Sequence, residues 1–379
     1  MSITLAELKE LDQKDYQIID IRDEIEVSHG AIPRAVVLRP EEIAASEKTD
    51  HSKKLVICCS RGKNSVEVAE ALREQGFDAV SLEGGYAAWL LDYFEEQEKN
   101  ANDEFAKNVE LSLRKTYKKR IWSKFTKAIN TYELVKPGDK IAVCISGGKD
   151  SMLMAKCFQE LKLHNKFDFE VKFLVMDPGY SPANRKVIEE NAKRLHIPIT
   201  IFESDIFDSV YHIEKNPCYL CARMRRGHLY HYAKELGCNK IALGHHYDDV
   251  IETILMGMLY GAQIQSMMPK LHSTNFEGME LIRPLYLVRE DDIKAWRDYN
   301  GLRFIQCACK FTDTCTTCNN EENRSKRMEI KELIKTLKKV NPYVEANIFK
   351  SVENVNLDTM ICYKTNGEKH HFLDTYDHR

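Results

Sequence analysis

The stretch Ile141–Ser151 reads IAVCISGGKDS, and it decides how the larger part of this chain folds. Five apolar residues, a glycine pair and then a helical pattern predict a buried strand, a tight loop and the start of a helix. Glycine lets backbone amides approach an anion closely, and the first turn of a helix adds free N–H groups and a positive dipole end. With the mobile ammonium of Lys149, these groups predict a loop that holds a phosphate chain.

This loop is not a Walker A loop, because it lacks the G-x-x-x-x-G-K-[ST] spacing. It resembles instead the pyrophosphate-binding loop of the PP-loop ATPases, which split ATP into AMP and pyrophosphate to adenylate a substrate. The resemblance implies catalytic roles for Lys149 and Asp150. The alternative for so short a motif is a surface turn rich in small residues. The expected nucleotide-binding residues of the loop are Ser146, Gly147, Gly148, Lys149, Asp150 and Ser151.

The composition suits a water-soluble chain of two or three domains: 379 residues, 43% hydrophobic and 30% charged. No apolar segment is long enough to span a bilayer and no signal-peptide pattern opens the chain, so we expect no membrane partner and a cytoplasmic location. Twelve cysteines, crowded into Cys-x-x-Cys and Cys-x-Cys units, favour thiol chemistry or metal binding in a reducing compartment. The net charge of −3 gives no global sign of nucleic acid, but residues 107–127 are basic, with Tyr117 and Trp122 among them. They predict either a phosphate-binding surface or a solvated linker helix.

The first hundred residues predict a second parallel α/β unit, with strands at residues 18–22 and 55–58 and a helix after residue 65. Cys59 begins a loop whose amides, together with the amino terminus of the following helix, can stabilise a thiolate. Arg61 and Lys63 add positive potential, which favours a nucleophilic thiol. The alternative is a buried structural cysteine, and we expect Cys58 to be one.

Residues 1–95 resemble a rhodanese domain. The resemblance rests on the Asp20-x-Arg22 strand end, the segment 29–35, the six-residue loop Cys59–Asn64 and the motif Leu82-Glu-Gly-Gly-Tyr-x-x-Trp89. It implies that Cys59 carries a persulfide and passes the outer sulfur onward, after loading by a cysteine desulfurase or another sulfur donor. A six-residue loop is typical of the sulfurtransferases rather than of their phosphatase relatives, whose loop is longer.

Two further strands, at residues 171–176 and 240–244, predict a doubly wound sheet around the phosphate loop. Ligands of such sheets bind outside the carboxyl ends of the strands. We therefore expect main-chain groups around Met176 and Asp177 to line the adenosine pocket, and Gly244 to permit close approach of the backbone. Asp249, or its neighbour Asp248, is expected to hold Mg²⁺ beside the pyrophosphate, although an isolated acid here would be an ordinary helix cap.

Six cysteines form three groups beyond the phosphate loop, with the spacing of metal or iron–sulfur ligands. They are Cys218, Cys221, Cys307, Cys309, Cys315 and Cys318. A shared iron–sulfur site is the favoured interpretation. A structural zinc site with four cysteine ligands is the alternative.

Residues 120–350 resemble the TtcA family of tRNA 2-thiocytidine synthetases. The matching motifs, in order, lie at Pro217–Gly227, Leu243–Asp249, Glu252–Leu255, Met268–Lys270 and Arg283–Leu285. The resemblance implies ATP, Mg²⁺ and an oxygen-sensitive [4Fe-4S] cluster held by three cysteines, two of them Cys218 and Cys221. The third ligand stays open between the two later pairs, with a slight preference for Cys307 and Cys309, and the remaining thiols are compatible with a separate zinc site.

The sequence therefore predicts an α/β protein in which a rhodanese-like parallel domain (1–97) precedes a basic helical linker (98–135). A doubly wound PP-loop ATPase domain, of the adenine nucleotide alpha hydrolase-like type, is expected at 136–290, and a cysteine-containing helical region at 291–379. The resemblance implies that the chain adenylates cytidine 32 of tRNA and replaces its 2-oxygen with sulfur. The alternatives are 2-thiouridine synthesis, sulfur transfer to a small molecule, an adenylating ligase without sulfur chemistry, and a redox-sensing protein. A homodimer is left open.

Overall fold

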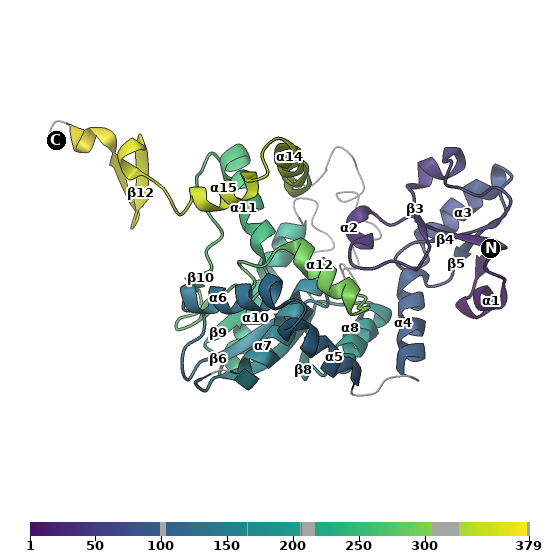
Figure 1. Ribbon diagram of the computed structural model, residues 1–379, viewed down its shortest axis with the longest axis horizontal. Coiled ribbons are helices and arrows are strands. Elements are labelled where there is room, and N and C mark those ends of the chain that lie inside the picture. The colour runs from purple at the N-terminus through teal and green to yellow at the C-terminus, as the bar shows by residue number, and fades with distance from the viewer. Residues whose placement is uncertain (99–103, 165, 205, 207–216, 305–325, 377–379) are drawn as a thin grey trace. The chain divides into compact units, whose positions relative to one another are not determined.

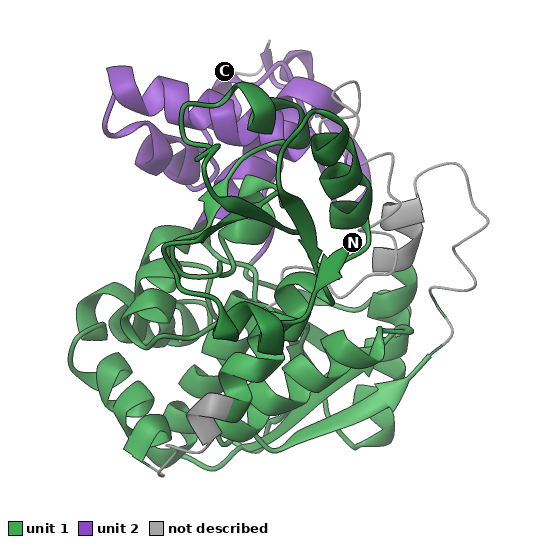
Figure 2. Cartoon of the chain, turned by 90° about the vertical axis from the view of Figure 1, so that its right-hand side faces the viewer, with its two compact units in different colours: residues 1–247, 269–319 green, residues 248–268, 320–379 purple. Residues whose placement is uncertain are grey.

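The computed structural model describes residues 1–379 except 99–103, 165, 205, 207–216, 305–325 and 377–379 (Figure 1). The chain divides into two compact units, the first formed by residues 1–247 and 269–319 and the second by residues 248–268 and 320–379 (Figure 2). The first unit contains two predominantly parallel sheets with helices between their strands, which confirms the predicted α/β class.

The first sheet has five strands in the order β1-β5-β4-β2-β3, and all its neighbouring strands are parallel. Its core is aliphatic: Ile19, Leu55 and Ile57 are fully buried and pack with Ile43 and Leu72. The strands are β1 (Ser2–Ile3), β2 (Tyr16–Asp20), β3 (Val36–Val37), β4 (Lys54–Cys58) and β5 (Ala79–Leu82). The helices are α1 (Leu5–Glu10), α2 (Glu24–Val27), the 3₁₀ turn η1 (Pro40–Ala45), α3 (Asn64–Glu74) and α4 (Gly85–Glu98).

The strand predicted at residues 18–22 is β2, which ends at Asp20 rather than at Arg22. Arg22 leaves the strand because its backbone N–H and its guanidinium both bind the Asp20 carboxylate, at 3.1 Å and 2.6 Å. Both residues are buried, so the ion pair stabilises the turn that leads into α2.

The second sheet has six strands in the order β10-β11-β9-β6-β7-β8, parallel except for the β10–β11 pair. The chain moves from β6 to β7 and β8 on one side and then crosses to β9 on the other. A switch point therefore lies between β6 and β9, where ligands bind in doubly wound sheets. The strands are β6 (Lys140–Ile145), β7 (Glu170–Asp177), β8 (Ile199–Glu203), β9 (Lys240–Ala242), β10 (Lys270–His272) and β11 (Glu280–Ile282).

The basic segment between the sheets forms helices with a buried apolar face. Leu113, Ile121 and Phe125 are fully buried, while Arg120 and Lys124 form ion pairs with Asp292 at 2.6 Å and 3.3 Å. Arg114 likewise pairs with Glu160 at 3.3 Å, so these three cations have intramolecular partners. The further helices of the first unit are α5 (Glu104–Arg114), the π-helical turn η2 (Lys118–Trp122), α6 (Ser123–Thr131), α7 (Lys149–His164), α8 (Pro182–Arg194), α10 (Pro217–Glu235) and α12 (Glu290–Tyr299).

Within the first unit, the segment after α12 contacts the N-terminal sheet domain. The backbone N–H of Phe304 donates to the carbonyl of His29 at 3.3 Å, and the Tyr93 hydroxyl donates to the carbonyl of Gly301 at 3.2 Å. Helix α8 contacts the same domain, because the guanidinium of its last residue, Arg194, lies over the ring of Phe94 in α4, 5.1 Å from the ring centroid. Cation–π contact and hydrogen bonds therefore stabilise this interface.

The second unit is mainly helical and carries a small antiparallel hairpin. Its ion pairs join α11 to α14, as in the pair between Arg327 and Asp249. In the described part of the chain, no helix is both long and apolar enough to cross a membrane. The elements are α11 (Tyr247–Gly261), α14 (Lys326–Val340), α15 (Val344–Ser351), the 3₁₀ turns η5 (Leu357–Thr359) and η6 (Phe372–Asp374), and strands β12 (Cys362–Thr365) and β13 (Glu368–His371).

Candidate active site

The SGGKDS loop connects β6 to α7 at the switch point of the second sheet. Gly147 has φ +85°, and a Cβ on it would fall 2.6 Å from Cγ1 of Ile188, so the turn requires glycine there. Ser151 closes the loop, because its hydroxyl oxygen accepts from the N–H of Ser146 at 3.2 Å and donates to the carbonyl of Gly148 at 2.9 Å. The loop therefore holds its shape through its own side chains.

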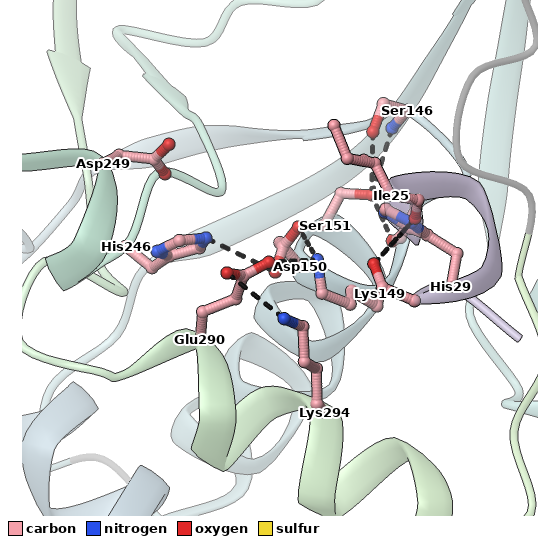
Figure 3. A network of polar contacts seen from close by, with 12 residues as sticks. Ile25, His29, Ser146, Lys149, Asp150, Ser151, His246, Asp249, Glu290 and Lys294 are labelled. Carbon is pink, nitrogen blue, oxygen red and sulfur yellow. Dashed lines mark hydrogen bonds and ion pairs between the residues drawn. The ribbon is translucent and has the colours of Figure 1, made fainter. Parts of the chain in front are cut away.

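Lys149, the first residue of α7, is 2% exposed and lies between two carboxylates (Figure 3). Its ammonium is 3.2 Å from Oδ2 of Asp150 and 3.2 Å from Oε1 of Glu290. His246, which follows β9, lies with Nε2 3.9 Å from Oδ1 of Asp150. The predicted catalytic pair is thus assembled with two residues, Glu290 and His246, that were not predicted to take part.

Three further residues, Gly244, Met176 and Asp177, were predicted to lie around the nucleotide. A Cβ on Gly244 would meet the backbone of Asp150 and Ser151 at 3.2–3.4 Å, so the chain after β9 packs tightly against the loop. Met176 is buried in β7. The carboxylate of Asp177 accepts from the backbone N–H groups of Gly179 at 2.9 Å and Tyr180 at 2.6 Å, which shapes the loop after β7.

Asp249 lies in the first turn of α11, in the second unit, and its Oδ1 contacts the guanidinium of Arg327 at 2.6 Å. The nearby carboxylate of Glu252 is buried and pairs with Arg327 at 3.6 Å and Lys331 at 3.7 Å. The residue predicted to hold Mg²⁺ therefore has a protein cation beside it.

Cys59 lies directly after β4 and is 7% exposed. Its sulfur accepts from the backbone N–H of Gly62 at 3.1 Å and lies 3.3 Å from the hydroxyl of Ser65, at the start of α3. A second hydroxyl, that of Ser81 on β5, supports Ser65 at 2.8 Å. An N–H and a hydroxyl aimed at one sulfur are suited to stabilising negative charge on it.

A glycine at position 85 allows the Cys59 loop to pack closely. Gly85 has φ +58°, and a Cβ there would lie 2.2 Å from the carbonyl oxygen of Cys59. The next residue, Tyr86, donates its N–H to that carbonyl at 2.8 Å. The Gly85-Tyr86 part of the rhodanese motif is therefore explained by contact with the cysteine loop.

The groups next to Cys59 differ from it in burial and partners. Burial raises the pKa of the Cys58 thiol well above its usual range, which disfavours its thiolate form. Glu26 of α2 accepts a hydrogen bond from the Ser60 hydroxyl at 2.6 Å, and burial raises the pKa of its carboxyl. Glu26 is a neighbour of the loop that the sequence pattern did not indicate.

The predicted iron–sulfur ligands lie outside the part of the chain whose side chains the structure describes. Cys218 and Cys221 belong to α10, and the other four fall within residues 305–325. Among the described side chains, no group of three or more His, Cys, Asp or Glu residues is arranged to hold a metal ion. The cluster remains a prediction.

Each of the two large sheets lies in a part of the chain that matches a known protein family. Residues 113–313 match the family described as PP-loop domain, and residues 4–92 match the family described as rhodanese-like domain. The PP-loop match covers more than half of the chain. The chain is therefore a PP-loop protein that also carries a rhodanese-like domain.

Curated relatives define its family more closely. Those from Coxiella burnetii (strain RSA 493) and Geotalea uraniireducens (strain Rf4) are 35% and 36% identical to it over 249 and 254 residues, or 64% of this chain and 91% and 96% of theirs. One from Neisseria meningitidis serogroup C is 35% identical over 231 residues, 60% of this chain and 69% of the relative. All three are named tRNA-cytidine(32) 2-sulfurtransferase. The chain belongs to this family of sulfurtransferase enzymes.

Two of the solved structures that match the chain illustrate its similarity to each domain type. The U34-tRNA thiolase NcsA from Methanococcus maripaludis, solved with its [4Fe-4S] cluster, is 22% identical with a TM-score of 0.48, over 63% of this chain and 81% of that one. A rhodanese-like domain protein from Staphylococcus aureus is 37% identical with a TM-score of 0.22, over 23% of this chain and 89% of that one.

Proposed function

We propose that this enzyme uses ATP to thiolate tRNA, converting cytidine 32 of the anticodon loop to 2-thiocytidine. The observation that carries the proposal is the family membership, because the relatives are named for this reaction. The geometry supports it independently, since one chain holds both a loop suited to the phosphates of ATP and a cysteine suited to carrying sulfur.

In the activation step, ATP binds with its phosphates over Ser146–Ser151. The 2-oxygen of the base bonds to the α-phosphorus, pyrophosphate leaves, and AMP becomes the leaving group on the base. Lys149 and the amides at the start of α7 offset the negative charge that develops on the phosphate in this transition state. Asp150 holds the ammonium of Lys149 at 3.2 Å. The base has to be unstacked to react, which costs less in a loop than in a helix.

In the second step, a sulfur nucleophile displaces AMP. Cys59 supplies the sulfur as a persulfide formed on its Sγ, which has the N–H of Gly62 and the hydroxyl of Ser65 beside it. A thiol reductant is needed, because the outer sulfur of a persulfide is two electrons more oxidised than the sulfur of a thiocarbonyl group. A [4Fe-4S] cluster held by Cys218, Cys221 and one of the later cysteines would supply an iron atom for sulfur to bind.

Several partners complete the proposal. A cysteine desulfurase or another sulfur donor loads Cys59, Mg²⁺ accompanies ATP with Asp249 as its proposed ligand, and the reaction belongs in the reducing cytoplasm. The exposed side chains of Arg223 and Arg226 on α10 are suited to tRNA phosphates, which position a substrate without identifying it. We keep the domain boundaries 1–97, 98–135, 136–290 and 291–379 as part of this proposal.

The test is mass spectrometry of tRNA nucleosides from a deletion strain complemented with variants. We expect 2-thiocytidine to be absent from the deletion strain, restored by the wild-type chain, and not restored by Lys149→Ala. Cys59→Ser should lower it strongly, whereas Cys58→Ser serves as the matched control because Cys58 is its fully buried neighbour.

A different outcome would identify a different function. Loss of 2-thiouridine with 2-thiocytidine intact would replace the proposed base by uridine. Full activity of a Cys59→Ala, Cys218→Ala double variant would contradict sulfur chemistry and favour an adenylating ligase.

A further inference from the structure

Glu290 is a residue of the phosphate site that comes from a distant part of the chain. It is the first residue of α12, and its Oε1 lies 3.2 Å from the ammonium of Lys149 (Figure 3). The sequence around it shows no phosphate-binding pattern. The fold alone brings it to the loop.

The buried ammonium of Lys149 needs negatively charged partners such as Glu290. A buried ammonium is costly unless it is paired, and the four-carbon stem of lysine is flexible. Asp150 on one side and Glu290 on the other, each at 3.2 Å, limit where the ammonium can lie. Asp150 is next to Lys149 in sequence and moves with the same helix turn, so Glu290 supplies the restraint from outside the loop.

Glu290 is itself held in place. Its Oε2 lies 3.4 Å from the ammonium of Lys294, one turn further along α12. The helix is anchored by Trp296, which is fully buried and donates its indole N–H to the hydroxyl of Ser112 at 3.1 Å. A second anchor is Asp292, paired with Arg120 at 2.6 Å. The carboxylate therefore lies on a rigid element, which a positioning group requires.

We propose that Glu290 is a positioning residue for Lys149, holding its ammonium where negative charge develops on the α-phosphate. The proposal rests on the function proposed above, because it takes Lys149 to contact the phosphates of ATP. Glu290 acts through Lys149 and not on the substrate. Its loss should slow adenylation more than it weakens ATP binding, since misplacement of a catalytic group is felt mainly in the transition state.

The experiment compares Glu290→Ala, Glu290→Gln and the control Asp291→Ala in the full-length chain. Asp291 is an acid in the same helix turn with an exposed side chain. Single-turnover AMP formation is measured with tRNA, and the Kd of a non-hydrolysable ATP analogue is measured separately. We expect Glu290→Ala to slow AMP formation about 30-fold with the Kd changed less than about threefold. Glu290→Gln keeps an oxygen that accepts from the ammonium and should recover most of the rate, and Asp291→Ala should behave as wild type.

Three results would overturn the inference: an unchanged rate in Glu290→Ala, a Kd that rises in proportion to the loss of rate, or no recovery in a folded Glu290→Gln variant. A wild-type enzyme that forms no AMP with any tRNA would instead contradict the proposed function. In that case the positioning role of Glu290 is tested by acylating the protein with acetic anhydride. The rate of modification of Lys149 is followed by peptide mass spectrometry. Lys149 should react faster in Glu290→Ala than in wild type and Glu290→Gln, and equal rates in all three would overturn the positioning role.

Discussion

His29 is a buried histidine whose surroundings disfavour its charged form. Its Nδ1–H donates to the carbonyl of Ile25 at 2.8 Å, and its own carbonyl accepts from Phe304. Burial, and then the positive charge of Lys149, lower its pKa from 6.5 to about 4. The neutral imidazole is therefore the form that fits the interface between the rhodanese-like domain and the segment after α12.

This predicts a loss of stability in mild acid. Below pH 6.5 the unfolded chain binds a proton at His29 that the folded chain does not, so the stabilisation present at neutral pH falls as the pH falls from 6.5 towards 4. At pH 5 the free energy of unfolding is lower by about 2 kcal/mol than at neutral pH because of this histidine.

The check is urea unfolding of wild type and His29→Gln at pH 7.5 and pH 5. We expect the wild type to lose about 2 kcal/mol more than the variant between the two pH values. His51→Gln is the matched control, because His51 is an exposed histidine of the same domain. Equal losses in wild type and His29→Gln would show that His29 does not titrate in this way.

At the scale of elements, α7 is held to its neighbours by a buried lysine. Lys156 is fully buried, and its ammonium contacts Glu110 of α5 at 2.8 Å and the carbonyl of Leu195, just after α8, at 3.0 Å. The helix that begins with Lys149 is thus fixed to two helices by one side chain. The pair also ties α5, which follows the rhodanese-like domain, to the PP-loop domain.

Lys156→Met should destabilise the protein by about 3 kcal/mol, because it leaves a carboxylate and a carbonyl without their buried donor. Thermal and urea unfolding measure the loss. Lys162→Met, in the exposed last turn of the same helix, should change stability by less than about 0.5 kcal/mol. A loss in Lys156→Met no larger than in Lys162→Met would show that the buried pair contributes nothing net.

At the scale of the whole molecule, the chain joins a rhodanese-like domain, which we propose carries sulfur, to a PP-loop domain, which we propose uses ATP. Tethering gives the two sites a high effective concentration, in the millimolar range for short linkers. Sulfur should therefore pass within one chain rather than between chains.

Mixing two inactive full-length variants tests this. Cys59→Ser retains the phosphate loop and Lys149→Ala retains the cysteine loop, so only transfer between chains can thiolate tRNA in the mixture. At about 1 µM of each variant we expect the rate to stay below a few per cent of wild type and to rise with concentration. A rate close to half that of wild type at 1 µM would contradict transfer within one chain, and would indicate a dimer that exchanges sulfur between subunits.

The sequence by itself determined the α/β class, the loops Cys59–Asn64 and Ser146–Ser151, and the order of these loops along the chain. These features depend on short-range physics: apolar runs form strands, glycine permits the turns at Gly147 and Gly85, and the first turn of a helix attracts anions. The family followed from motifs of the same local kind. Strand ends were predicted less well where a side chain such as Arg22 binds back to its own strand.

Only the tertiary structure decided which distant residues contact those of the predicted motifs. Glu290 reaches Lys149, Ser81 supports the hydroxyl beside Cys59, and Arg327 contacts Asp249. None of these partners lies within the motif that it supports, because long-range pairing is set by strand order and helix packing rather than by neighbouring residues. The physical reason is that a buried charge takes its partner from whatever element the core places beside it.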